Sequence, residues 1–404
     1  MKTIEGGILA AKGFTASGIN CGIRKNRTKN DLTLIYSEKP ASAAALYTRN
    51  LVKGAPLTVT RRHLSDGIAR AVIVNSGNAN TCNADGIEVA EETCSILAKE
   101  LSIAPEDVVV ASTGVIGQTL DVAPIRNGMK KLVSGLSRGG LDDAIEGIMT
   151  TDTVKKHSAV EFEIGGSTVR IGGIAKGSGM IHPDMATMLV FITTDCNITP
   201  EMLSFALSED VQKTFNMVSV DGDTSTNDMV VTLANGLAGN RLINAKGADF
   251  EAFAAALNTV TVSLCRQIAS DGEGATKLLE CAVTGGKTPE AAKTAAKSVI
   301  CSSLLKAAMF GADANWGRVL CAIGYSGADV DVTKIDVSFR SAVGTVTVCR
   351  NGAGVAFSEE LAKKILSEKE IFILADLNDG PFGATAWGCD LTYDYVKING
   401  DYRT

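Results

Sequence analysis

The chain has 404 residues, of which 45% are hydrophobic and 21% are charged, and its formal net charge is −6. This is ordinary globular composition, with enough length for a large core and more than one subdomain. The acidic balance excludes nucleic acid as an expected partner, and no apolar run approaches the ~18 residues that a membrane span requires.

The N-terminus and the cysteines indicate a cytoplasmic protein. The opening stretch "MKTIEGGILAAKGF" is interrupted by Glu5 and three glycines, so it lacks the continuous apolar centre of a signal peptide. None of the ten cysteines lies within four residues of another, so there is no C-x-x-C motif. We expect the cysteines to be small buried hydrophobic residues. The densest basic stretch, "RKNRTK", is interpreted as a solvated turn.

Short apolar runs bounded by turn residues predict strands in the first half of the chain. The predicted strands are 69–77, 106–114, 167–175 and 187–195. The last two are joined by a glycine-rich loop. Apolar residues at helical spacing predict a helix over 86–102, with Asp85 as its N-cap.

Helical patterns dominate the second half. The predicted helices are 199–215, 249–272 and 287–311. Segment 356–380 predicts a helix followed by a strand, and the alternation in 384–404 predicts a strand-like end that is tied into a sheet. Because strands and helices interleave, the fold class is α/β (α+β), with layered sheets flanked by helices.

Several common catalytic and binding motifs are absent. The chain has three histidines, of which His63 and His157 lie in polar settings that predict surface positions, and it has no G-x-S-x-G motif. "TGGKT" lacks the first glycine of a phosphate-binding loop. The acidic run "DGDTSTND" has Thr226 where a calcium loop needs glycine, so no metal site is expected.

Thr187 lies where a glycine-rich loop meets an apolar strand, in "AKGSGMIHPDMATMLVFITTD". A threonine hydroxyl is a weak nucleophile that needs a partner base. If the Ala186–Thr187 bond were cut, the new α-amine would titrate near pH 7.7–8.0 and could act as that base. The pattern alone favours an ordinary threonine at the start of a strand.

The segment "KGSGMIHPDMATML" resembles the self-cleavage segment of the ornithine acetyltransferase family, also called bifunctional glutamate N-acetyltransferases. Essentially the whole chain carries the resemblance, since further stretches are similar to family motifs. These stretches are "GFTASGINCGIRKNRTKNDLTLI", "VNSGNANTCNADG", "ASTGVIGQ", "MTTDT", "DGDTSTNDM", "SDGEGATK", "GADANWGRVL" and "CDLTYDYVKINGDYRT".

The resemblance implies a precursor that cuts itself before Thr187 into an α chain, residues 1–186, and a β chain, residues 187–404. Thr187 would accept an acetyl group from N2-acetyl-L-ornithine and pass it to L-glutamate in a ping-pong reaction of arginine biosynthesis. Some members also use acetyl-CoA as the donor; no other cofactor is implied. The family suggests two α and two β chains and a fold that resembles N-terminal-nucleophile enzymes.

The resemblance also implies roles for residues matched to the family's motifs. The oxyanion-hole pair falls on Thr113 and Gly114. The substrate-binding positions fall on Thr150, Lys176, Thr187, Glu273, Asn399 and Thr404. Lys176 could hold the substrate α-carboxylate, and Glu273 could meet the ornithine ammonium or assist proton transfer.

The residues leave some alternatives open. Thr151 or Thr153 replaces Thr150 if the alignment slips, and the working base is either the Thr187 amine or Glu273. A related self-processing amidohydrolase or aminopeptidase would pass the acyl group to water instead of glutamate. A protein with a dead site would show no cleavage, and a narrower relative would acetylate another amine.

Overall fold

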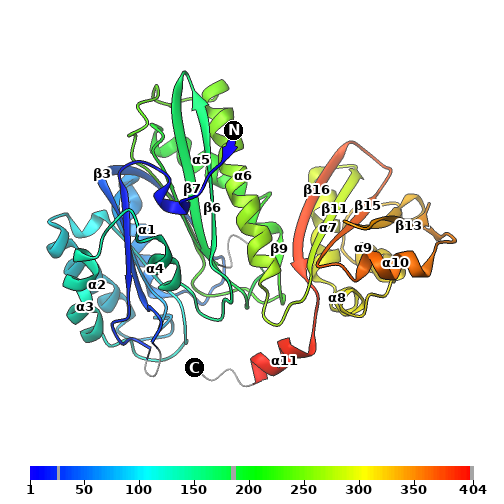
Figure 1. The fold of residues 1–404 in the computed structure, drawn as a ribbon, viewed down its shortest axis with the longest axis horizontal. Coiled ribbons are helices and arrows are strands. Elements are labelled where there is room, and N and C mark those ends of the chain that lie inside the picture. The colour runs from blue at the N-terminus through cyan, green and yellow to red at the C-terminus, as the bar shows by residue number, and fades with distance from the viewer. Residues whose placement is uncertain (25–27, 183–187, 401–404) are drawn as a thin grey trace.

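The computed structural model describes residues 1–24, 28–182 and 188–400, which form two β-sheets in two parts of the molecule (Figure 1). The first sheet has the order β1-β6-β7-β8-β10-β3-β4-β5, with β2 paired to β3. The second has the order β14-β13-β12-β15-β11-β16-β9. These layered sheets with flanking helices confirm the predicted fold class.

The first sheet carries the strands that surround the glycine-rich loop. Its strands are β1 (Lys2–Thr3), β2 (Phe14–Ile19), β3 (Leu32–Tyr47), β4 (Ile68–Asn75), β5 (Val108–Ser112), β6 (Lys156–Ile164), β7 (Ser167–Lys176), β8 (Leu189–Thr194) and β10 (Met229–Ala234). Strands β7 and β8 are antiparallel neighbours, and β10 runs parallel to β8. The predicted pair of strands on either side of the loop is therefore adjacent in the sheet.

Six of the helices in the described residues belong to the first part of the chain. They are α1 (Ala55–His63), α2 (Gly86–Leu101), α3 (Ala123–Ser134), α4 (Leu141–Glu146), α5 (Pro200–Val211) and α6 (Ala248–Ser270). Helices α2, α5 and α6 match predicted helices. The N-cap of α5 is Thr199, whose side chain accepts a hydrogen bond from the Met202 N–H, whereas Asp85 makes no such bond at α2.

The second sheet and its helices form the C-terminal part. The strands are β9 (Val218–Ser219), β11 (Leu278–Gly286), β12 (Asp336–Ser341), β13 (Gly344–Arg350), β14 (Ala353–Gly354), β15 (Glu370–Asp376) and β16 (Phe382–Cys389). The helices are α7 (Pro289–Cys301), α8 (Ser303–Phe310), α9 (Trp316–Gly324), α10 (Glu359–Leu366) and α11 (Tyr393–Gly400). Five 3₁₀ turns are η1 (Gly7–Leu9), η2 (Leu64–Asp66), η3 (Pro105–Asp107), η4 (Phe215–Met217) and η5 (Val332–Lys334).

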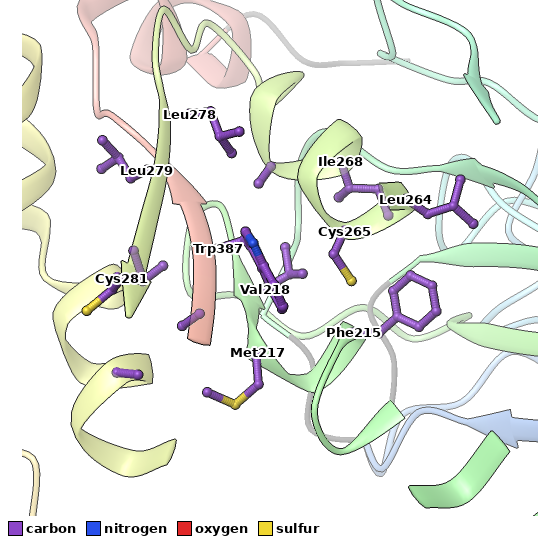
Figure 2. Close-up of a cluster of buried hydrophobic side chains, with 14 of the residues drawn as sticks. Phe215, Met217, Val218, Leu264, Cys265, Ile268, Leu278, Leu279, Cys281 and Trp387 are labelled. Carbon is purple, nitrogen blue, oxygen red and sulfur yellow. The ribbon is translucent and has the colours of Figure 1, made fainter. Parts of the chain in front are cut away.

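A continuous apolar core joins the two parts through α6. Leu264, Cys265 and Ile268 on α6 are fully buried and belong to the same core as Leu279 and Cys281 of the second sheet (Figure 2). Burial of this apolar surface fixes α6 between the sheets. The C-terminal end of α6 is consequently held where the two parts meet.

Two predicted elements were wrong in their extent. The helix over 287–311 is divided at Ser302, whose backbone ends α7 and whose hydroxyl caps α8 by accepting the Leu305 N–H. The strand-like end over 384–404 is a strand only to Cys389 and then becomes helix α11. No residue of α11 is buried, so its apolar alternation did not report a buried face.

Several predictions about exposure were also wrong. His63 is only 5% exposed, because its ring nitrogen Nδ1 lies 2.8 Å from the Val108 carbonyl oxygen. Cys82 and Cys321 are exposed instead of buried. Arg24 is anchored and not simply solvated, since its Nε donates to the Ser76 carbonyl at 2.7 Å.

Among the described helices, none is both long and apolar enough to cross a membrane.

Candidate active site

A pocket of about 550 Å³ lies where several strand and helix ends of the chain meet. Its lining residues are Ala79, Thr113, Gly114, Val115, Ile116, Gln118, Thr150, Thr151, Lys176, Gly179, Met180, Ser225, Thr226, Asn227, Glu273 and Asn399. Six residues that the sequence singled out therefore share one cavity, although they come from segments separated by up to 286 positions in the sequence. The predicted residues Ala186, Thr187 and Thr404 lie outside the described residues.

The turn after β5 has a shape that only glycine permits. Gly114 has a φ of +129°, and a Cβ on it would lie 2.8 Å from the Asn78 backbone nitrogen. The preceding residue is fixed as well, because the Thr113 N–H donates to the Asn75 carbonyl at 2.9 Å. The Thr113 hydroxyl and the Gly114 backbone thus reach the pocket from a rigid turn.

Asn227 is hydrogen-bonded to segments next to this turn, and it was not among the predicted site residues. Its Nδ2 donates to the Ala79 carbonyl at 2.5 Å and to the Ser112 carbonyl at 2.9 Å, while its Oδ1 accepts from the Thr81 hydroxyl at 2.6 Å. A buried amide with these partners is rigidly oriented. Its only sequence signal was its place in "DGDTSTND".

Lys176, the last residue of β7, provides a cation beside the turn at Thr113 and Gly114. Its Nζ lies 3.4 Å from the Thr113 hydroxyl oxygen. Burial lowers the pKa of Lys176, while the negative charges of Asp152, Asp228 and Glu273 oppose that change. The site therefore contains an ammonium that gives up its proton more readily than a lysine in water.

The three threonines of the loop that precedes β6 differ in what they contact. Thr150 and Thr151 line the pocket, and the Thr151 hydroxyl lies 2.7 Å from the Ser178 hydroxyl. Thr153 instead bonds to Asp271 through both its backbone N–H and its hydroxyl. Of the three threonines, the structure places Thr150 and Thr151 within reach of a ligand in the pocket.

Glu273 follows α6 and is held in place by two other segments. Its backbone N–H donates to the Ser178 carbonyl at 2.9 Å, and its Oε2 accepts from the Asn399 Nδ2 at 2.8 Å. Gly179 makes room for this carboxylate, because a Cβ there would lie 2.4 Å from Oε2. The Glu273–Asn399 pair connects α11 to the pocket.

The described residues on either side of 183–187 lie close to the pocket. Met180 lines it, and the backbone N–H groups of Met180 and Ile181 donate to Asp221 at 2.6 and 2.9 Å. On the other side, the Met188 carbonyl accepts from the Met229 N–H at 2.9 Å. Leu189 is the ladder partner of Lys176 across β8 and β7. The chain position of Thr187 is thus two residues from the strand partner of Lys176.

Asp228 is a buried carboxyl group near the same pocket. It is 3% exposed, and one of its carboxyl oxygens has no hydrogen-bond partner among the described residues. Burial raises the pKa of Asp228 well above its usual range, against the opposing charge of Lys176.

The groups that the pocket offers to a ligand are hydroxyl, amide, ammonium and carboxylate. In residues 1–24, 28–182 and 188–400, no three His, Cys, Asp or Glu side chains are grouped to hold a metal ion. Such a set can bind the two charges of an amino acid and donate hydrogen bonds to a carbonyl oxygen.

Comparisons with known proteins identify the family. The model of the ArgJ family matches residues 15–404. The arginine biosynthesis bifunctional protein ArgJ 1 of Clostridium acetobutylicum is 53% identical, over 97% of this chain and 96% of the relative. The ArgJ bifunctional protein of Caldanaerobacter subterraneus subsp. tengcongensis is 50% identical, over 100% of both chains.

A crystal structure of the arginine biosynthesis bifunctional protein ArgJ from Bacillus halodurans is also similar. It is 45% identical, with a TM-score of 0.50, and the match covers 52% of this chain and 98% of that chain. Together with the pocket, these matches confirm the resemblance found in the sequence: the chain belongs to the ArgJ family, whose members are acyltransferases of arginine biosynthesis.

Proposed function

We propose that this ArgJ-family enzyme cuts itself between Ala186 and Thr187 and transfers acetyl from N2-acetyl-L-ornithine to L-glutamate through acetyl-Thr187. Acetyl transfer between ornithine and glutamate is the reaction of the family. The observation that carries the residue-level account is the single pocket in which Thr113, Lys176 and Glu273 meet. In that pocket an oxyanion turn, a cation and an anion are within reach of one small substrate.

The charges of the pocket fit the charges of the acetyl donor. N-acetylornithine carries an α-carboxylate and a side-chain ammonium, whereas the acceptor glutamate carries two carboxylates and an α-amine. Lys176 binds the α-carboxylate as a point charge. The Glu273 carboxylate, oriented by Asn399, binds the side-chain ammonium of N-acetylornithine.

The reaction then proceeds in two balanced halves. The Thr187 hydroxyl attacks the acetyl carbonyl carbon, the C–N bond of the amide breaks, and ornithine leaves after its nitrogen takes the proton. The glutamate amine next attacks the ester, and the Thr187 oxygen leaves and regains a proton. In both halves the Thr113 hydroxyl and the Gly114 N–H stabilise the oxyanion of the tetrahedral intermediate.

The α-amine of Thr187 is the proposed base in this scheme. Glu273 already accepts a hydrogen bond from Asn399 and packs against Gly179, which suits a binding role. An α-amine with a pKa near 7.7–8.0 is substantially unprotonated at neutral to mildly alkaline pH. Cleavage would place this base on the same residue as the hydroxyl that takes up the acetyl group.

The proposal extends to the second acetyl donor, the assembly and the location of the enzyme. The relatives are named bifunctional, which supports acetyl-CoA as a second acetyl donor that binds as a substrate. Residues 1–186 and 187–404 would form the α and β chains of an assembly with two copies of each. A cytoplasmic location fits the biosynthetic role of the family.

The acceptor distinguishes this function from that of a related hydrolase. Enzyme loaded with acetyl from isotopically labelled N-acetylornithine should release N-acetylglutamate on addition of L-glutamate, at least 100-fold faster than acetate in buffer alone. Thr187→Ala should take up no label. Equal release with and without glutamate would identify water as the acceptor and contradict the transferase.

Gly114→Ala should lower kcat about 10²–10³-fold, because its Cβ would collide with the Asn78 backbone and displace an oxyanion donor. Gly117→Ala is the matched control, since Gly117 also has a positive φ, +76°, but a Cβ there meets nothing within 4 Å. Steady-state kinetics of both variants tests the assignment. Similar losses in the two variants would point to general strain in the loop.

Lys176 should produce an alkaline limit on donor binding. Because burial lowers the pKa of Lys176, its charge is lost at a pH below that of an ordinary lysine, so kcat/KM for N-acetylornithine should fall there. In Lys176→Arg, which stays charged, this fall should move to higher pH. The exposed-residue control Lys364→Met should keep the wild-type profile, and an unchanged profile in Lys176→Arg would refute the role.

A further inference from the structure

Lys156 is a fully buried lysine outside the lining of the pocket. It begins β6, and its side chain is 0% exposed. Its Nζ donates to Asp152 Oδ1 at 2.6 Å and to Asp271 Oδ2 at 2.5 Å, and both carboxylates are buried with it. Burying three charges is costly unless each is paired and further hydrogen-bonded, so their partners indicate what the arrangement achieves.

Asp152 also accepts hydrogen bonds from two backbone N–H groups, one in a pocket residue and one in the residue after a pocket residue. Its Oδ2 accepts from the Thr150 N–H at 3.0 Å, and its Oδ1 accepts from the Gly177 N–H at 2.7 Å. Gly177 directly follows Lys176. Burial alone would raise the pKa of Asp152, but the charges of Lys156 and Lys176 and the Gly177 bond lower it to about 2, so it stays ionised.

Asp271 connects the same lysine to a third segment. It is the residue at which α6 ends, two positions before Glu273, and it accepts hydrogen bonds from the Thr153 N–H at 3.1 Å and from the Thr153 hydroxyl. One ammonium therefore ties together the loop of Thr150, the end of β7 and the end of α6. Each of these segments presents a side chain to the pocket.

We propose that Lys156 is a positioning residue for acetyl transfer, which holds Asp152 and Asp271 so that Thr150, Lys176 and Glu273 converge on the substrate. This inference rests on the proposed function, because the three positioned residues are its substrate-binding groups. Lys156 itself does not line the pocket, and it acts through the two aspartates.

The network also has a net charge that faces Lys176. Two carboxylates and one ammonium leave one negative charge. The charged groups that act on Lys176 are Asp152, Asp228 and Glu273, which favour its protonated form, and Lys156, which opposes it. Within the network, Asp152 therefore supports the charge of Lys176, and the cation of Lys156 opposes it.

The test needs a variant that removes the cation without leaving excess buried charge. Lys156→Met alone leaves two carboxylates without their cation and is expected to impair folding. The double variant K156M/D271N keeps one negative charge, as in the wild type. Its control is R170M/E161Q, which removes an ion pair of 2.8 Å from the same two strands, β6 and β7, five residues along β6 from Lys156.

The double variant should fold, as judged by circular dichroism, and should raise KM for N-acetylornithine at least tenfold while kcat changes less than threefold. The control should keep both constants within twofold of the wild-type values. Lys156→Arg, which keeps the cation, should have a KM much closer to that of the wild type than to that of the double variant. An unchanged KM in the folded double variant, or an equal rise in the control, would overturn the proposal. If the double variant does not fold, Asp271→Asn alone, which removes the ion pair between Lys156 and the end of α6, decides the matter: a raised KM supports the proposal and an unchanged KM overturns it.

Parallel measurements on the wild type separate this proposal from the proposed function. Wild-type enzyme that takes up no acetyl group from N-acetylornithine would contradict the function itself. The positioning role would then be read from equilibrium binding of L-ornithine to the same proteins. There the Kd should rise tenfold in the double variant and not in the control, and equal affinities would overturn the positioning role.

Discussion

The ammonium of Lys156, buried between the carboxylates of Asp152 and Asp271, is the interaction on which the geometry of the pocket depends. A charge removed from water fixes its partners closely, because any movement leaves it unpaired in a medium of low dielectric constant. Here the partners are spread along the chain. Asp152 also accepts hydrogen bonds from the backbone of Thr150 and Gly177, and Asp271 accepts one from the backbone of Thr153. Distant segments are thus brought into register by one side chain.

Apolar packing provides the frame in which this polar network operates. Helix α6 is buried against both sheets (Figure 2). Asp271 and Glu273 follow directly on its C-terminal end. Asn227 bonds to the Ser112 carbonyl, directly before the turn at Thr113 and Gly114, and to the Ala79 carbonyl. A site that forms at the edges of two packed units can be rigid and still accessible to a small substrate.

Local sequence patterns predicted much of the fold because helices and strands depend largely on the periodicity of apolar residues and on turn residues nearby in the chain. The strands on either side of the glycine-rich loop and helices α2, α5 and α6 followed from periodicity and turn residues. Helix α11 was mistaken for a strand because it buries no side chain, and the break at Ser302 depends on a single cap. Burial of His63 was missed because its partner, the Val108 carbonyl, is distant in sequence.

The candidate site residues were available from the sequence only through the family resemblance. By pattern alone Lys176 and Glu273 are ordinary loop residues, and nothing in their neighbourhoods indicates that they share a pocket. The Lys156 network was not predicted at all, since Asp152 and Asp271 lie in separate motifs and their link to one lysine is purely tertiary. Long-range pairing of charges leaves no periodic signal in one chain.

The central claim is that Thr187 becomes an N-terminal residue and then carries the acetyl group. Intact-mass spectrometry of the purified protein under denaturing conditions, before and after incubation with N-acetylornithine, tests both parts. The account predicts two species that correspond to residues 1–186 and 187–404, of which only the second gains one acetyl group. A single uncut chain that gains no acetyl group would contradict it.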